Sequence, residues 1–252
     1  MNVAIVGYGF VGKATEYFLN KYTKDSVIQI HDKFQDKVIK DWKDIDFAFI
    51  CVPTNLNDGR LDISIIDSVI AEIPRDVQII IRSTIGPDQC LKYARENGAI
   101  VMPEFLRERH WQEDVDDMDL PIVVGSSEVN LFNEWIKNTS SPKEIFIVRP
   151  QEASMMKMAR NAALAMKVAL ANDFKEMCDS FLEMDYNVLR VFLESDVNLG
   201  GTHWAVPGPD NKEGFGGTCL PKDLTHASSL CYNLHNIMNT AVEANKRRRD
   251  DG

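Results

Sequence analysis

The sequence contains no apolar run approaching the roughly 18 residues that a membrane-spanning helix requires. It enters a short apolar segment at once, without a charged stretch before it, so we see no signal peptide. Basic residues are also few: 28 Lys and Arg stand against 38 Asp and Glu, a formal net charge of −10. This balance argues against a general affinity for nucleic acid or for an anionic membrane. We therefore expect a cytoplasmic protein with neither kind of partner.

Cysteine pairs are equally scarce. The five cysteines are an odd number, no CxxC pair occurs, and no His/Cys cluster has the spacing of a zinc site. We therefore expect no metal ion and a reducing compartment, in which a free reactive thiol is permitted. The cysteines stand at positions 51, 90, 178, 219 and 231.

Glycine and proline are both absent from Gln151 to Leu199. Ala, Met, Leu and Lys dominate this stretch, which predicts one long helix over residues 152–183 and a second ending near Ser195. The first half is apolar nearly all round, which is typical of a helix buried in a core or a subunit interface. Lys157 and Asn161 share one face because they are four apart. Lys157 is either extended toward solvent along its stem or held in a site.

The last helix is expected to end near Lys246, where a run of basic side chains suits the negative end of a helix dipole. We place the domain boundary at Arg149-Pro150, which gives a first domain of residues 1–149 and a helical domain of residues 150–252. That helical domain is a candidate for homodimerisation through its long central helix.

The N-terminus has the order strand, GxGxxG, helix, strand, acid. Residues 2–6 are apolar, Gly7-Tyr8-Gly9-Phe10-Val11-Gly12 follows, and a second strand over residues 26–32 ends at Asp32. In this setting the glycines make a tight turn and let a pyrophosphate approach the helix N-terminus. Asp32 would accept hydrogen bonds from a ribose and would repel a 2′-phosphate, which predicts NAD rather than NADP.

Alternation of strands and helices continues to about residue 148. It predicts an α/β fold: a Rossmann-type, doubly wound parallel sheet, followed by an all-helical domain with one long central helix. Ligands gather at the carboxyl ends of parallel strands. Thr54, Ser83, Thr84 and Glu104 follow such ends and are candidate site residues. The remaining strands are expected at residues 47–52, 77–81, 99–102, 122–124 and 145–148.

Three glycines precede Cys219 in the segment from Gly214 to Asp223. Pro221 predicts a helix start, so the Cys219 thiol would lie at the positive end of a helix dipole, close in sequence to Lys222. Both effects favour the nucleophilic thiolate. Glycines without side chains would let a substrate approach the sulfur. Asp223 would lie in the first helical turn and handle a water.

The assembled motifs resemble those of the UDP-glucose 6-dehydrogenase family of NAD-dependent nucleotide-sugar dehydrogenases. The most specific is GFGGTCLPKD, and MPEFLRE, CVPTN, RSTIGP and the Lys157-to-Asn161 spacing support it. The resemblance implies that a sugar CH2OH is oxidised to a carboxylate with two NAD per turnover, through a thioester on the enzyme. UDP-glucose would become UDP-glucuronate, as in polysaccharide biosynthesis.

The resemblance also implies roles for individual residues. Cys219 resembles the nucleophile, Lys157 and Asn161 the pair that stabilises oxyanions, and Asp223 and Thr84 the residues that order a water. Glu104 resembles an acid/base for thioester hydrolysis, and Glu108 a residue beside both cofactor and sugar. Cofactor contacts are further implied for Gly7 to Gly12, Asp32, Lys33, Cys51, Pro53, Thr54, Ser83 and Thr84. Sugar contacts are implied for Glu104, Phe105, Leu106, Arg107, Glu108, Lys157, Asn161, Phe215, Gly216, Gly217 and Cys219.

Some features depart from the family pattern. Asn198-Leu199-Gly200 replaces Arg-Ile-Gly, Arg109 replaces a common glycine, and the match ends near Asn245, before the family's C-terminal UDP-binding domain. Two other functions therefore stay open. One is a two-electron dehydrogenase of the 3-hydroxyacid type, which needs no cysteine. The other is a homologue that binds NAD without turnover.

Overall fold

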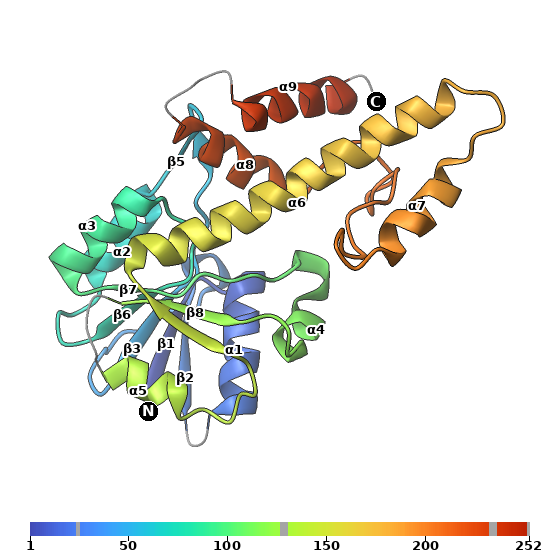
Figure 1. The fold of residues 1–252 in the computed structure, drawn as a ribbon. Helices are drawn as coiled ribbons and strands as arrows, with labels where there is room; N and C mark the ends of the chain where they lie inside the picture. The colour runs from blue at the N-terminus through green and yellow to red at the C-terminus, as the bar shows by residue number, and fades with distance from the viewer. Residues whose placement is uncertain (24–25, 127–130, 232–235, 251–252) are drawn as a thin grey trace. The chain divides into compact units, whose positions relative to one another are not determined.

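The computed structural model describes residues 1–23, 26–126, 131–231 and 236–250. Figure 1 labels the helices and strands, and their bounds follow. The strands are β1 Asn2–Val6, β2 Val27–His31, β3 Phe47–Ile50, β4 Leu56–Asn57, β5 Arg60–Leu61, β6 Gln78–Ile81, β7 Ile100–Val101, β8 Ile122–Gly125 and β9 Ile145–Val148. The α-helices are α1 Phe10–Tyr22, α2 Ser64–Glu72, α3 Pro87–Asn97, α4 Trp111–Asp116, α5 Leu131–Lys137, α6 Pro150–Asp179, α7 Tyr186–Ser195, α8 Leu220–Ser229 and α9 Ile237–Asp250. Two 3₁₀ turns, η1 and η2, cover Lys33–Gln35 and Glu108–His110.

Within the described residues, seven strands form one sheet in the order β2-β1-β3-β6-β7-β8-β9. The predicted α/β fold is confirmed, and the sheet is mostly parallel. One pair departs from the parallel arrangement: β7 and β8 run antiparallel, with Val101 opposite Gly125. The connection between them, residues 102–121, contains η2 and the six-residue helix α4 and returns the chain to the same end of the sheet.

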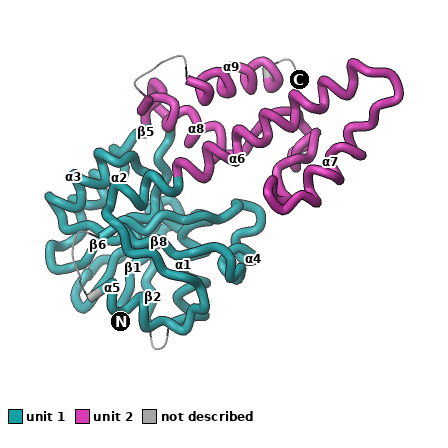
Figure 2. Tube along the Cα trace, in the orientation of Figure 1, with its two compact units in different colours: residues 1–55, 61–157 teal, residues 56–60, 158–252 magenta. Residues whose placement is uncertain are grey.

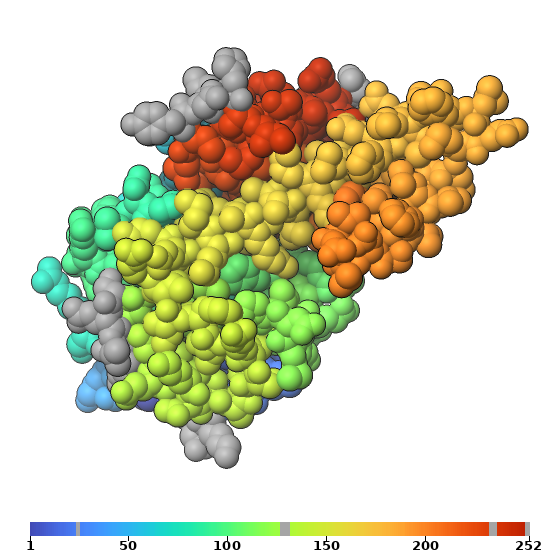
Figure 3. Space-filling view, in the orientation of Figure 1, coloured from blue at the N-terminus to red at the C-terminus, as the bar shows by residue number. Residues whose placement is uncertain are grey.

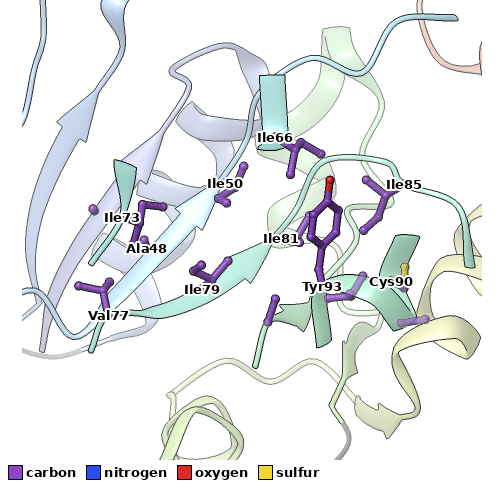
Figure 4. Close-up of a cluster of buried hydrophobic side chains, with 14 of the residues drawn as sticks. Ala48, Ile50, Ile66, Ile73, Val77, Ile79, Ile81, Ile85, Cys90 and Tyr93 are labelled. Atoms are coloured by element: carbon purple, nitrogen blue, oxygen red, sulfur yellow. The ribbon is translucent and has the colours of Figure 1, made fainter. Parts of the chain in front are cut away.

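Side chains that alternate along the central strands supply two separate cores. Val3, Ile5, Phe47 and Phe49 face α1, α4 and α5, while Ala4, Ala48 and Ile50 face α2 and α3. Figure 4 shows the second core, in which Tyr93 of α3 lies beside Ile81 and Ile85. Because both faces are covered, these strands read as continuous apolar runs in the sequence.

The chain places β2 on one side of β1 and β3 on the other side. The strand order therefore reverses at the β1–β3 pair. The two strands stay paired up to their carboxyl ends, since Cys51 N donates to Val6 O at 2.7 Å. A doubly wound sheet binds nucleotides at this switch point. The first glycine loop, Gly7 to Gly12, starts there.

The chain divides into two compact units, coloured separately in Figure 2. Unit 1 contains residues 1–55 and 61–157, and unit 2 contains residues 56–60 and 158–252. The division falls inside α6, whereas the boundary predicted from composition lies just before that helix, at Arg149-Pro150. Part of unit 2 is the tip of a hairpin that the sequence analysis does not predict. Its strands β4 and β5 are joined through Asp58 and Gly59, both at positive φ, as a tight Asp-Gly turn requires.

Unit 2 is built around α6, which continues for 30 residues because no glycine or proline interrupts it. Its alanines at 162 and 165 pack against Phe215, Leu224 of α8 and Val242 of α9. Farther along, Ala171 and Cys178 pack against Tyr186 and Leu193 of α7, and against Trp204. Helix α9 ends at Asp250 rather than near Lys246, so the basic run falls in its last turn, as the dipole favours.

Helix α6 is less buried than its composition predicts. Met155, Met156, Leu170 and Met177 are each 40 % or more exposed. The expectation that the first half is covered on all sides is therefore wrong for this chain by itself. The end of α6 and α7, drawn in yellow to orange in Figure 3, carries further exposed apolar side chains, among them Phe181, Leu182 and Phe192. No helix among the described residues combines the length and apolar character needed to cross a membrane.

Candidate active site

The first glycine loop has the geometry that close approach of a phosphate requires. Gly7 has φ +89°, and a Cβ on it would lie 2.8 Å from Cys51 O. A Cβ on Gly12 would lie 2.2 Å from Gly7 O, so α1 can pack against the loop only without a side chain there. No heavy atom in the described part of the chain lies within 4 Å of a Cβ on Gly9, the residue before α1. The loop is thus closed on its inner side and open at the helix N-terminus, where anions bind.

Asp32, between β2 and η1, is tied to this loop. Its Oδ2 accepts from Tyr8 N at 2.7 Å, and its Oδ1 accepts from Phe34 N and Gln35 N at 2.9 and 3.2 Å. A carboxylate offers about four acceptor positions, so about one remains for a ligand hydroxyl. Lys33, another predicted cofactor residue, forms an ion pair with Glu72 at 2.6 Å.

The predicted residues after β3 and β6 brace each other. Thr54 Oγ1 donates to Thr84 O at 2.8 Å, and Ser83 Oγ donates to Val52 O at 2.7 Å. Cys51 is buried, and loss of solvent raises the pKa of its thiol to about 11, so it stays protonated. Pro53 is exposed. The structure thus gives Thr54 and Ser83 a supporting position, with their hydroxyl protons directed at backbone carbonyls.

Glu104 and Lys157 form a buried ion pair in unit 1. Their side chains are 4 % and 3 % exposed, and Lys157 Nζ lies 2.5 Å from Glu104 Oε1 and 2.8 Å from Glu104 O. Of the two placements open for Lys157, the structure thus favours the held one. Burial by itself raises the pKa of Glu104, but the charge and hydrogen bond of Lys157, with the Leu106 N–H, outweigh it and leave that pKa below its ordinary value. At neutral pH Glu104 is therefore a carboxylate.

Arg82 is a candidate site residue that sequence reasoning missed. It directly follows β6 in the motif RSTIGP, is 8 % exposed, and its Nε has no hydrogen-bond partner among the described residues. Burial lowers the pKa of its guanidinium, while Cys51 and Glu104 raise it. Arg82 and Glu104 line a cavity of about 50 Å³, room for one or two waters. A charged residue at a strand end was the available signal.

The four residues after Glu104 differ from one another in burial and in contacts. Phe105 is buried, and Leu106 N binds the Glu104 carboxylate. Arg107, also predicted to contact sugar, donates to the buried Asp114 from Nε and Nη2 at 2.9 and 2.6 Å. Glu108 is exposed at the start of η2.

In unit 2, Cys219 lies immediately before the first residue of α8, as the proline predicted. The thiol is partly exposed, with Thr218 Oγ1 3.7 Å from its sulfur. Gly217, at φ +77°, has no described heavy atom within 4 Å of a Cβ position. We call residues Gly214 to Gly217 the second glycine loop. Within it, Gly217 leaves open space close in sequence to Cys219.

Asp223 of α8 is fully buried and is joined to α6, because its Oδ2 accepts from Asn161 Nδ2 at 2.6 Å. Its Oδ1 lies 3.5 Å from Lys222 Nζ and has no hydrogen-bond partner among the described residues. His226, one turn later, was missed by sequence reasoning. It is 4 % exposed, burial lowers the pKa of its imidazole, and neither ring nitrogen has a described hydrogen-bond partner. A spacing of three after the aspartate was its only signal.

The predicted residues therefore gather in two sets, one in each unit. Unit 1 holds the first glycine loop, Asp32, and the Glu104–Lys157 pair, and unit 2 holds Asn161, Asp223 and Cys219. Across the described ranges no group of three or more His, Cys, Asp or Glu side chains is arranged to hold a metal ion. The class that the fold defines is an α/β domain with a mostly parallel sheet, followed by a helical domain that carries a partly exposed cysteine at the start of α8.

Comparisons with known proteins show which family the chain resembles. Residues 151–247 match the central domain of the UDP-glucose/GDP-mannose dehydrogenase family. The chain is 30 % identical over 249 residues to the UDP-glucose 6-dehydrogenase of Rickettsia bellii. This alignment covers 91 % of the chain and 56 % of the relative. The resemblance to the nucleotide-sugar dehydrogenases is therefore confirmed. The chain spans little more than half the length of that relative.

Solved structures support the same fold. A UDP-D-ManNAc dehydrogenase from Pyrococcus horikoshii superposes with a TM-score of 0.79 at 19 % identity, covering 100 % of this chain and 69 % of the other. A UDP-glucose dehydrogenase from Pyrobaculum islandicum gives 0.77 at 20 % identity, covering 99 % and 68 %. At this identity the likeness establishes fold alone.

Proposed function

We propose that the protein oxidises the C6 alcohol of a nucleotide sugar to the carboxylate, in four electrons, with UDP-glucose as the substrate and UDP-glucuronate as the product. The observation that carries this proposal is the partly exposed Cys219 at the start of α8, beside an open glycine. An aldehyde has no hydride to give until a nucleophile converts it to a tetrahedral adduct, and a thiolate supplies that nucleophile. The match of residues 151–247 supports the same assignment.

The proposed cofactor is NAD, which accepts hydride from the substrate carbon when bound. The residues fit it: the first glycine loop is open at the α1 N-terminus, no described side chain caps that helix, and Asp32 keeps about one acceptor position. The pyrophosphate would lie on the α1 backbone N–H groups, and the ribose on Asp32. A 2′-phosphate there would meet the Asp32 carboxylate, which favours NAD over NADP.

The chain's own residues then have the following roles. After oxidation of the alcohol to the aldehyde, Cys219 adds to the carbonyl carbon, and the carbonyl oxygen takes up the negative charge. Lys157 and Asn161 stabilise that oxygen. Loss of the second hydride leaves a Cys219 thioester. Glu104, ionised at neutral pH, accepts a proton from water, with Asp223 and Thr84 orienting it, and the carboxylate product leaves Cys219 as a thiolate.

Stoichiometry tests this function. With UDP-glucose and NAD, we expect two NADH per sugar consumed, measured by absorbance and product mass, and slower turnover with NADP. A two-electron dehydrogenase of the 3-hydroxyacid type would give one NADH, and a homologue that binds NAD without turnover would give none. UDP- and GDP-sugars are screened in parallel because the departures at Asn198 and Arg109 affect sugar recognition. Equal rates with NADP would contradict the role of Asp32.

We further propose a homodimer through α6. Leu170 and Met177, seven residues apart on one face of the helix, are 46 % and 56 % exposed, and Phe192 of α7 is 61 % exposed. Apolar area of this kind is normally covered by a partner. Light scattering at micromolar concentration is expected to give twice the monomer mass, and Leu170→Glu to lower it. A monomeric unmutated protein would contradict the proposal. A cytoplasmic location stays a prediction.

A further inference from the structure

Side chains from helices α6 and α9 hold the second glycine loop. The proposed reaction gives these side chains no role. Asn172 of α6 accepts from Gly214 N through Oδ1 at 2.8 Å. Asn245 of α9 accepts from Phe215 N at 2.7 Å and donates to Phe215 O at 3.0 Å. Arg249, one turn later on α9, donates to Gly214 O at 2.9 Å and to Asp210 Oδ2 at 2.6 Å. Both backbone groups of two successive loop residues are thus satisfied by side chains.

Packing explains two of the glycines in a way that the sequence did not indicate. A Cβ on Gly214 would lie 2.3 Å from Asn245 Oδ1, and a Cβ on Gly216 would lie 2.5 Å from Arg249 Nη2. These two glycines make room for side chains of α9. The sequence analysis expects a substrate to approach the sulfur beside a glycine. Among the loop glycines, Gly217 fits this expectation, because no described heavy atom lies within 4 Å of its Cβ position.

A segment with three glycines in four residues has little stiffness of its own. Helix α8 fixes the chain on the far side of Cys219, and the near side needs a restraint as well. The hydrogen bonds from Asn172, Asn245 and Arg249 supply that restraint, at Gly214 and Phe215. Both residues are buried, whereas Gly217 and Thr218 are exposed. The restraint therefore ends where the open part of the loop begins.

We propose that Asn172, Asn245 and Arg249, here called the clamp residues, are positioning residues that hold the second glycine loop in the conformation that presents Cys219 to its substrate. This inference rests on the proposed function of Cys219. It assigns α9 a part in the reaction, through the backbone of Gly214 and Phe215, without contact with the reacting atoms.

The test compares Asn245→Ala and Arg249→Ala with the control Arg248→Ala. Arg248 lies on the same helix and forms ion pairs with Asp173 and Glu176 at 2.6 and 3.1 Å, and it makes no hydrogen bond to the described residues of the loop. We measure the rate of Cys219 alkylation by iodoacetamide in a Cys231→Ser background, together with KM and kcat for the sugar. The three remaining cysteines are buried.

A freed loop exposes the sulfur but misplaces it. Asn245→Ala is therefore expected to raise the alkylation rate about threefold or more, to raise KM, and to lower kcat/KM about tenfold, as the loss of two hydrogen bonds allows. Arg248→Ala should change each less than twofold. Asn245→Asp, which keeps the acceptor for Phe215 N, should fall between. If alkylation and KM stay unchanged while thermal stability falls, the clamp residues are structural only and the inference is wrong.

A double-mutant cycle keeps the inference testable if single variants fold poorly. Gly216→Ala should be harmful because of the Arg249 guanidinium, and less harmful in the Arg249→Ala background. Additive effects would contradict the packing explanation. Alkylation reports on Cys219 without turnover. If it responds as expected but no sugar yields NADH, the proposed function fails and the clamp stands.

Discussion

Replacing Cys219 with serine is expected to stop the reaction before the acid. Serine has no accessible anionic form near neutral pH and would be a poorer leaving group in the final hydrolysis. The first oxidation and its reverse need no adduct, so Cys219→Ser should still reduce a supplied sugar aldehyde with NADH. The expected stoichiometry therefore falls from two NADH per sugar to one or fewer, measured in single-turnover experiments.

Mass spectrometry of the quenched protein adds a direct readout, because the unmutated chain should carry sugar mass on Cys219. The matched control is Cys231→Ser. Cys231 is the other partly exposed cysteine and follows the same helix, with its sulfur 3.7 Å from Ala227 O. The Cys231→Ser variant should still produce two NADH per sugar. Two NADH per sugar at an undiminished rate in Cys219→Ser would show that no thioester forms.

Replacing Lys157 with methionine is expected to have the second large effect, on both rate and stability. The change keeps an unbranched apolar side chain at this position. It removes the lysine charge, so the buried Glu104 carboxylate loses its partner. Breaking a buried pair in this way typically costs about 3–5 kcal/mol of folding free energy. The rate should fall about a hundredfold or more, since both oxidations pass through an oxygen bearing negative charge.

Glu104→Gln in the Lys157→Met background separates the two effects. Removing both charges should restore much of the stability, measured by urea unfolding, but none of the rate. Lys167→Met is the control on the same helix: Lys167 binds Leu199 O and Gly200 O at 2.7 Å, away from the Glu104 pair. A Lys157→Met enzyme that is destabilised yet turns over normally would reduce the lysine to a structural role.

Local features of the chain were readable because their signals are local. The glycine spacing after β1 and the acid at Asp32 predicted the first loop, since a tight turn restricts residue type within a few positions. Pro221 predicted the start of α8 and so the place of Cys219.

Tertiary structure decided which of these residues meet. Lys157 finds Glu104 across 53 positions, and Asn161 finds Asp223 across 62, distances over which no periodic pattern carries information. The same holds for Gly214 and Gly216: the sequence shows that a side chain is missing, and only packing shows that Asn245 and Arg249 fill the space. Residue type and short spacing determine backbone conformation through sterics and hydrogen bonds close by, whereas the charge state of Glu104 and the restraint on Cys219 depend on groups that folding brings together.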